Sequence, residues 1–595
     1  LHFGKKRIPL KGLAGWMPAL LTRLQWPAGK KPNLDSFLVR EIQVKKLVAL
    51  FLAAITFGVC AAERPVVKVD TGSLQGTIEY GMQVFKNIPY AAAPVGDLRW
   101  RPPQPALSWS GMRDASKFGE SCPQQYIKNL SDGLGLPGSE DCLKLNVYGP
   151  VKPGKNLPVM VWIHGGGLIV DGARDPQFTP INLIKNGVIV VTVDYRLGSL
   201  GFFATKELIE EAKAKGEPVG NYGTMDQIAS LKWVKKNIQA FGGDPNNVTI
   251  FGQSAGGRSV TWLMVSDAAK GLFHKAIAQS AQQSPLRGMT EKRFGLTPEV
   301  DIGAKYMSSL GAKSLAELRK LPVQKLVLDG SAYYAGEFGG PFVDGQIIKG
   351  DPIPLFAAGK QAKVPFMIGT NSFDSDFMLP GEPSLEVFTK KIHEDPKIIE
   401  KLYADVKDKC ILNSFVIQDL MYRASTKLLA NSMNGVAPGY AYYYDYLTQN
   451  IRASLPGAPH TYEIPYVFGS LALVPQAPKQ ALTGVNQCAR IEKDVAEFKK
   501  THAWPKDWFP IVDKNSPQDQ AMSERLSSSW AAFARTGNPN VSGQANWPIY
   551  NLNADVMRNF SPGSETITGL LKDRVAYQAL HLREIYAIER LKDAF

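Results

Sequence analysis

The stretch Phe251-Gly252-Gln253-Ser254-Ala255-Gly256-Gly257 places one serine between two glycines, directly after the apolar run Val248-Thr249-Ile250-Phe251. This pattern predicts a strand, a sharp turn at Ser254 and then a helix. The turn forces the serine into an unfavourable backbone conformation, and a side chain larger than glycine two residues to either side would collide with the neighbouring strand or helix. Glycine is common here, at 54 of 595 residues, so a serine in an ordinary glycine-rich loop is the alternative.

Short apolar runs alternate with helical patterns on both sides of this stretch. Continuous apolar strands are typical of a parallel sheet that is covered on both faces. The predicted elements are strands at 159–163, 188–193, 248–251, 277–279, 364–368 and 440–446, and helices at 226–241, after Ser254 and near 575–590. The fold class predicted is α/β, with a large, mostly parallel central sheet and helices on both faces.

Three short β-rich segments precede this region, at 66–69, 76–78 and 84–88, and turns separate them. They predict a small antiparallel sheet at the N-terminal side of the domain. We find neither an internal repeat nor a low-complexity linker, so the sequence predicts one catalytic domain over residues 63–595.

The composition is that of a globular protein, with 44% hydrophobic and 21% charged residues. The formal net charge is +14, but residues 1–62 contain ten Lys or Arg and two Asp or Glu, which leaves +6 for the remaining chain. The remaining chain contains no basic run with interleaved aromatic residues. Nucleic acid is therefore not an expected partner.

Lys45-Lys46, the apolar segment 47–59 and the small residues Cys60-Ala61-Ala62 have the three parts of a secretory signal peptide. We interpret 44–62 as that signal, cleaved after Ala61 or Ala62, and 1–43 as an upstream extension outside the folded domain. The apolar segment is shorter than the roughly 20 residues of a membrane span. The expected location is therefore secreted or periplasmic, without stable membrane insertion.

Four cysteines remain after the signal: Cys122, Cys142, Cys410 and Cys488. None lies in a C-x-x-C motif or near a histidine, so no metal site is predicted. Cys122 and Cys142 are close enough in sequence to close a loop. Whether Cys410 pairs with Cys488 stays open.

A serine hydroxyl needs a histidine to accept its proton and a carboxylate to orient that histidine. Among the seven histidines, His164 precedes Ser254, whereas this turn motif is followed by the acid and then the histidine. Five others lie in the N-terminal extension, at a helix end, off the apolar face of the last helix or among charged residues. His460 remains, in the loop Gly457-Ala458-Pro459-His460-Thr461-Tyr462-Glu463, and is the predicted base.

His164 begins the run His164-Gly165-Gly166-Gly167 at the end of an apolar strand. Three consecutive glycines leave backbone N–H groups uncovered, and such groups bind an oxyanion together with the N–H of Ala255, the residue after the serine. A flexible glycine turn is the alternative, and the serine motif makes that alternative weaker.

Taken together, these motifs resemble the type-B carboxylesterase and cholinesterase-like family of the α/β-hydrolase fold, over nearly all of 63–595. The matching segments are 85–103, Ser139-Glu140-Asp141-Cys142-Leu143-Lys144-Leu145-Asn146-Val147, 164–167, Gly220-Asn221-Tyr222-Gly223 with Asp226-Gln227, Phe241-Gly242-Gly243-Asp244-Pro245, 251–257 and Thr536-Gly537-Asn538-Pro539-Asn540. The resemblance implies a disulfide between Cys122 and Cys142, and oxyanion donors at Gly166, Gly167 and Ala255.

The acid implied by the resemblance lies in Gly369-Thr370-Asn371-Ser372-Phe373-Asp374, where the family usually has glutamate at the last position. Aspartate is one methylene shorter, so either the loop sits closer to His460 or the contact is made differently. Asp376 is the rival carboxylate. We favour Asp374 because its register from Gly369 is that of the family.

The resemblance implies a serine carboxylesterase (EC 3.1.1.-) that hydrolyses small-molecule carboxylic esters through an acyl-enzyme intermediate, with no cofactor and no metal. A catalytically silent adhesion or binding protein and a lipase-like enzyme are the alternatives. Cholinesterase-like specificity is disfavoured, because the segment between Cys122 and Cys142 contains no tryptophan to face a quaternary ammonium. In addition, Gln253 is neutral where those enzymes have a carboxylate.

Overall fold

The computed structural model describes residues 64–125, 137–327, 340–375, 395–407, 409–476, 500 and 511–586. The chain divides into two units, Leu1–Glu63 and Arg64–Phe595, and the second contains all the described residues. The predicted signal peptide and the extension before it lie outside them.

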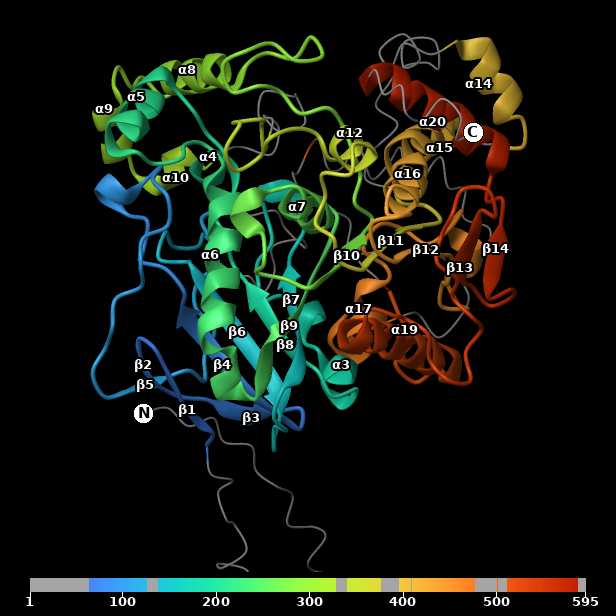
Figure 1. The fold of residues 1–595 in the computed structure, drawn as a ribbon, viewed down its shortest axis with the longest axis horizontal. Helices are drawn as coiled ribbons and strands as arrows, with labels where there is room; N and C mark the ends of the chain where they lie inside the picture. The colour runs from blue at the N-terminus through green and yellow to red at the C-terminus, as the bar shows by residue number, and fades with distance from the viewer. Residues whose placement is uncertain are drawn as a thin grey trace, which may run out of the picture. The chain divides into compact units, whose positions relative to one another are not determined.

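One sheet of eleven strands forms the framework of the second unit (Figure 1). Its strands are β3 (Thr77–Glu79), β4 (Met82–Pro89), β6 (Lys144–Pro150), β7 (Leu157–Ile163), β8 (Ile189–Val193), β9 (Gly243–Gln253), β10 (Lys275–Gln279), β11 (Phe366–Asn371), β12 (Gly439–Tyr444), β13 (Val556–Phe560) and β14 (Thr566–Thr568). The neighbours β8-β7-β9-β10-β11-β12-β13 pair in parallel, and antiparallel strands flank them at both edges. The predicted mostly parallel sheet is confirmed.

The sheet is buried on both faces, as β7 illustrates. Val159, Val161 and Ile163 pack in one hydrophobic cluster, which includes side chains of α6 (Tyr222–Asn237). Met160 and Trp162 point the other way, because successive side chains of a strand alternate between faces. They pack in a second cluster with side chains of α3 (Ile181–Lys185), α17 (Ile464–Phe468) and α19 (Pro517–Thr536). This double coverage explains why the strands read as continuous apolar runs.

A separate three-stranded sheet lies at the N-terminal side, formed by β1 (Val66–Val69), β2 (Gly72–Gln75) and β5 (Met112–Asp114). It differs in two respects from the small antiparallel sheet that the sequence predicts. Its strand β5 runs parallel to β2, and the predicted strands 76–78 and 84–88 pair in the large sheet as β3 and β4. Strand alternation predicts the strands themselves but not the sheet that they join, which for β3 and β4 is decided by the pairing of β4 with the distant strand β6.

The remaining α-helices are α4 (Gly198–Gly201), α5 (Lys206–Lys215), α7 (Ala255–Met264), α8 (Glu299–Ser309), α9 (Leu315–Lys320), α10 (Val323–Leu326), α12 (Pro352–Ala357), α14 (Pro396–Leu402), α15 (Lys409–Gln418), α16 (Ser425–Asn431) and α20 (Lys572–Tyr586). Short 3-10 turns are η2 (Gly96–Leu98), η3 (Gly166–Leu168), η4 (Pro176–Phe178), η5 (Ile238–Phe241), η6 (Asp267–Ala269), η8 (Arg452–Ser454) and η9 (Leu471–Leu473). One π-helical turn, η7 (Asp419–Ala424), lies between α15 and α16.

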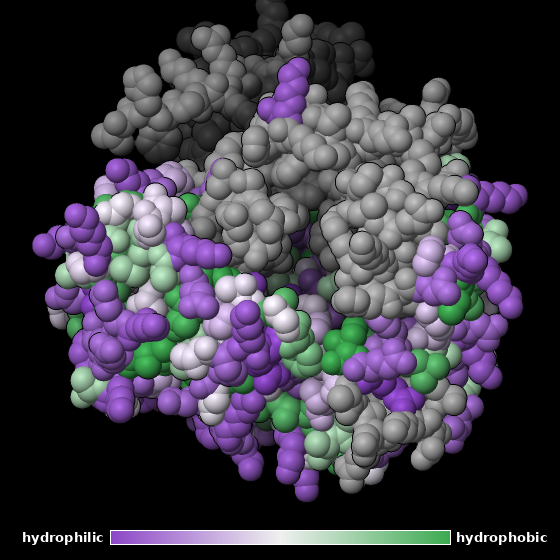
Figure 2. All heavy atoms as spheres, turned by 90° about the horizontal axis from the view of Figure 1, so that it is seen from above, coloured by the Kyte–Doolittle hydropathy of each residue, from purple (hydrophilic) through white to green (hydrophobic). Residues whose placement is uncertain are grey.

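Figure 2 shows the face on which α8, α12 and α20 lie, where hydrophobic and hydrophilic side chains of the described residues are interspersed. Among the described helices, none is both long enough and apolar enough to cross a membrane.

The structure contains the Cys122–Cys142 disulfide, which joins residues 20 apart in sequence and is buried. The side chains of Cys410 and Cys488 lie outside the described residues.

We expect the double variant Cys122→Ser/Cys142→Ser to unfold with a free energy lower by about 3 kcal/mol, because the bridge restricts the unfolded chain. Denaturant unfolding measures this difference. A reducing agent should destabilise the wild-type protein by a similar amount and leave the double variant unchanged. Equal stability of both proteins before reduction would contradict the prediction.

Candidate active site

Ser254 occupies the turn between β9 and α7, at the carboxyl edge of the sheet. Its backbone angles are φ 58° and ψ −126°, a sparsely populated combination for a residue with a side chain. The turn is held by its neighbours, since the Ser254 N–H donates to the Gln279 carbonyl at 2.9 Å, and the Arg258 N–H donates to the Ser254 carbonyl at 2.8 Å. This geometry is that of the serine-bearing turn that the sequence predicts.

Two glycines allow the turn to pass very close to β7. A Cβ atom at Gly256 would lie 2.0 Å from the Ile163 carbonyl oxygen, and one at Gly252 would lie 2.6 Å from the same oxygen. Real Cβ atoms essentially never approach backbone so closely. The glycines beside Ser254 are therefore required by a steric constraint, as the sequence predicts.

The run 164–167 follows the end of β7 and packs against the turn. A Cβ at Gly165 would lie 2.9 Å from the Gln253 carbonyl oxygen. Gly166 and Gly167 open the turn η3 with φ of 78° and 63°, which favour glycine. The first N–H groups of a helical turn have no partner within it, and this applies to Gly166 and Gly167 in η3 and to Ala255 at the start of α7.

His460 and Asp374 are in direct contact. The Nδ1 atom of His460 lies 2.5 Å from Oδ1 of Asp374, which is completely buried. The other carboxylate oxygen accepts hydrogen bonds from the Thr370 hydroxyl at 2.6 Å and from the Asn371 N–H at 2.8 Å. The structure thus brings together the histidine and the first of the two carboxylates that the sequence proposes.

Hydrogen bonds also join the loops that carry Asp374 and His460. The Phe373 N–H donates to the Ala458 carbonyl at 2.9 Å, the Ala458 N–H donates to the Ser372 hydroxyl at 2.6 Å, and Phe373 and Pro459 form an isolated parallel bridge. The short aspartate side chain therefore reaches the imidazole. The rival Asp376 lies outside the described residues.

Gln253, the residue before the serine, also contacts the imidazole. Its side-chain nitrogen lies 3.2 Å from Nε2 and 3.4 Å from Nδ1 of His460. The sequence identifies Gln253 as a neutral residue but gives no sign of this contact, which arises because the carboxyl end of β9 faces the loop of His460.

Glu463 is a buried carboxylate behind the histidine loop. It accepts hydrogen bonds from the side-chain amides of Gln279 at 3.0 Å and Asn371 at 2.7 Å, and Asn371 also donates to the Pro459 carbonyl at 2.7 Å. Burial raises the pKa of Glu463, and the negative charge of Asp374 raises it further. The sequence shows Glu463 three residues after His460, yet nothing there distinguishes it from a solvated turn residue.

His164 does not lie at the base position. Its ring is fully buried and stacks on Tyr195, with 4.4 Å between ring centroids. Burial lowers its pKa to about 3, so the ring is neutral at ordinary pH. His274 accepts a hydrogen bond from the Val248 N–H, within β9, at 3.1 Å. Both findings agree with setting these two histidines aside.

Within the described ranges, no group of three or more His, Cys, Asp or Glu side chains is arranged to hold a metal ion.

The strand order and the serine-bearing turn at the end of β9 define an α/β hydrolase. The solved structures that match the chain agree. A PNB esterase aligns with a TM-score of 0.69 and 28% identity over 86% of this chain and 99% of its own. A carboxylesterase of Geobacillus stearothermophilus aligns with a TM-score of 0.68 and 28% identity, over the same shares.

The chain belongs to the carboxylesterase family, whose sequence profile matches residues 63–577. It is 32% identical to the para-nitrobenzyl esterase of Bacillus subtilis (strain 168), over 82% of this chain and 92% of that protein. It is also 32% identical to carboxylesterase 1D of Mus musculus, over 85% and 91%. The protein is a carboxylic ester hydrolase.

Replacing Gly256 by alanine tests the steric constraint on the serine turn. We expect Gly256→Ala to lower the free energy of unfolding by about 1–3 kcal/mol, because the new Cβ overlaps the Ile163 carbonyl and the backbone has to shift. Thermal unfolding measures the loss of stability. Gly563→Ala is the control, since a Cβ there meets nothing within 4 Å. If Gly256→Ala and Gly563→Ala both unfold at the same temperature as the wild type, the steric constraint at Gly256 is refuted.

Proposed function

We propose that Ser254 is the nucleophile, His460 the general base and Asp374 the orienting acid in the hydrolysis of small-molecule carboxylic esters. The observation that carries this proposal is the 2.5 Å contact between His460 Nδ1 and Asp374. This contact makes Nδ1 the donor, so Nε2, which also lies 3.2 Å from the Gln253 side-chain nitrogen, is the ring nitrogen assigned to accept the serine proton. The strained turn at Ser254 supports the same assignment, because a turn of this kind presents its serine hydroxyl at the carboxyl edge of the sheet.

In the first step, Ser254 Oγ attacks the ester carbonyl carbon while its proton passes to His460 Nε2. The N–H groups of Gly166, Gly167 and Ala255 stabilise the resulting oxyanion. The carbon–oxygen bond to the alcohol breaks, His460 returns the proton to the departing alcohol oxygen, and an acyl-Ser254 ester remains. Water then attacks this ester with His460 as base, which releases the acid and restores the hydroxyl.

Two further assignments complete the proposal. Residues 63–595 form the catalytic domain, and 44–62 act as a signal peptide that exports it. The Cys122–Cys142 disulfide supports export, because disulfides persist in oxidising compartments. The mature protein from the periplasm or the medium should begin at Ala62 or Glu63, as mass spectrometry of its N-terminal peptide would establish.

The proposal predicts that Ser254→Ala lowers kcat for p-nitrophenyl esters by at least about 10⁴-fold, because the acyl-enzyme no longer forms. Circular dichroism should show an unchanged fold. A fluorophosphonate probe should label the wild-type protein and not the variant. Turnover by Ser254→Ala close to that of the wild type would refute the role of Ser254, and an unlabelled wild type would favour a silent binding protein.

Hydrolysis should fall at acidic pH, since a protonated His460 cannot accept the serine proton. A carboxylate beside the ring stabilises the imidazolium, so we expect the acid limb of the pH profile of kcat/KM to move to higher pH in Gln253→Glu. The control is Gln361→Glu, whose position contacts Ser432 and Met433 instead of the triad. A profile without an acid limb, or a limb that stays in place in Gln253→Glu, would contradict this account.

A further inference from the structure

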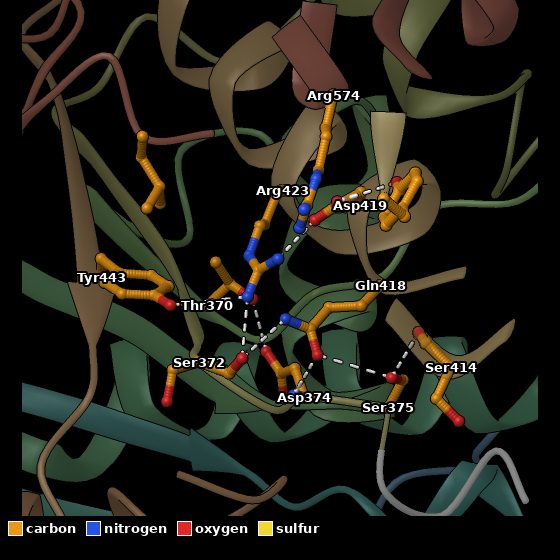
Figure 3. Close-up of polar contacts among 12 residues, drawn as sticks. Thr370, Ser372, Asp374, Ser375, Ser414, Gln418, Asp419, Arg423, Tyr443 and Arg574 are labelled. Atoms are coloured by element: carbon orange, nitrogen blue, oxygen red, sulfur yellow. Dashed lines mark hydrogen bonds and ion pairs between the residues drawn. The ribbon is translucent and has the colours of Figure 1, made fainter. Parts of the chain in front are cut away.

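The side chain of Gln418, at the end of α15, holds the turn that carries Asp374 (Figure 3). The Gln418 side-chain oxygen accepts a hydrogen bond from the Asp374 N–H at 2.7 Å, and its side-chain nitrogen donates to the Ser372 carbonyl at 2.9 Å. Gln418 is completely buried, so water does not compete for these two bonds. One amide therefore clamps the backbone on both sides of Phe373.

Arg423 supports this clamp with a charged donor. Its Nη2 atom donates to the same Ser372 carbonyl at 2.7 Å, and its Nη1 atom pairs with Asp419 at 2.5 Å. The other oxygen of Asp419 accepts a hydrogen bond from the Tyr403 hydroxyl at 2.8 Å. Arg423 and Asp419 are both buried, and Figure 3 shows the Arg423 guanidinium between Asp419 and Ser372.

The π-helical turn η7 makes the joint contact on Ser372 possible. In an α-helix with about 3.6 residues per turn, positions five apart point in clearly different directions. The wider i→i+5 repeat of a π-helix turns them toward the same side, and such turns occur often at functional sites. Gln418 and Arg423 are five residues apart, and both reach the Ser372 carbonyl.

The position of the Asp374 carboxylate depends on this backbone more than that of a glutamate would, because aspartate has one methylene fewer with which to compensate a shift. Its Oδ1 atom lies 2.5 Å from His460, so a displaced turn lengthens that contact directly. Catalytic groups have to be held within about 0.5 Å of the productive position.

We propose that Gln418 is a positioning residue for Asp374, with Arg423 as its support, and that this clamp sets the contact between the short acid and His460. This inference rests on the triad proposed above. The role proposed for Gln418 is more than structural, because one backbone turn couples this side chain to the chemical step.

The test replaces Gln418 by methionine, which has a similar length but forms neither hydrogen bond. Activity is measured on p-nitrophenyl esters per active site, and the sites are counted by fluorophosphonate titration, so that unfolded protein does not contribute. We expect kcat to fall by about tenfold or more with KM within about twofold, as for a small misplacement of a catalytic group. The acid limb should move to lower pH, because the imidazolium loses part of its stabilisation.

The matched control is Gln361→Met. Gln361 is also buried and donates to a backbone carbonyl, that of Ser432 at 2.8 Å, but it lies before β11 and not after it. The Gln361→Met variant should be less stable than the wild type, but its kcat per titrated site and the acid limb of its pH profile should be those of the wild type. An equal loss of kcat in both variants would assign Gln418 a general structural role and overturn the proposal.

A second substitution tests the link to the acid itself. The clamp should leave no room for a longer acid, so Asp374→Glu should lower kcat in the wild-type background. In the Gln418→Met background the turn can move back, so Asp374→Glu should lower kcat clearly less. Substitutions at residues in contact are not independent of each other. Independent, multiplying effects of the two substitutions would contradict the proposal.

If Gln418→Met does not fold, Gln418→Asn takes its place in the test, because the shorter side chain of asparagine cannot reach both the Asp374 N–H and the Ser372 carbonyl. A several-fold lower kcat per titrated site supports the clamp, and a wild-type kcat overturns it. The triad is tested separately by Ser254→Ala. If Gln418→Met has wild-type kinetics while Ser254→Ala is inactive, the clamp is wrong and the triad stands.

Discussion

The candidate site depends on a close approach between two backbones, where the start of α7 packs against the end of β7. The Gly256 Cα and the Ile163 carbonyl leave no room for a side chain, and the same holds at Gly252. This approach keeps Ser254 at positive φ, a conformation that costs on the order of 1–3 kcal/mol and persists only where the surroundings over-determine it. The glycine run after β7 packs against the same turn. One steric constraint thereby places both Ser254, the proposed nucleophile, and the glycine run whose amides are proposed to bind the oxyanion.

Parallel pairing extends this placement to the other groups. Strands β7, β9, β10 and β11 all end at the same edge, and their last residues are followed by the glycine run, Ser254, Ser280 and the turn of Asp374. In open α/β sheets, ligands bind outside the carboxyl ends of the strands. Among the proposed catalytic residues, His460 lies on a loop outside this set, and hydrogen bonds along Ser372, Phe373 and Ala458 hold that loop in place.

Much of this arrangement can be predicted from the sequence, because the decisive constraints are local. Glycines two residues either side of Ser254 predict the turn, and continuous apolar runs predict the parallel strands. Several contacts between segments far apart in the sequence could not be predicted. The pairing of β3 and β4 with the large sheet and the contact of Gln253 with His460 leave no sequence pattern. Gln418 and Arg423 read as ordinary helix residues, since the π-helical turn that aligns them is not visible as a periodicity.

The central claim is that Ser254, His460 and the three backbone amides act on one ester carbonyl group. A crystal structure of the protein after reaction with a p-nitrophenyl phosphonate tests it most directly, because the phosphonate imitates the tetrahedral intermediate. The account predicts a covalent bond from phosphorus to Ser254 Oγ, with the phosphoryl oxygen about 3 Å from the nitrogens of Gly166, Gly167 and Ala255. Phosphorus on another residue, or a phosphoryl oxygen that points away from these amides, would contradict it.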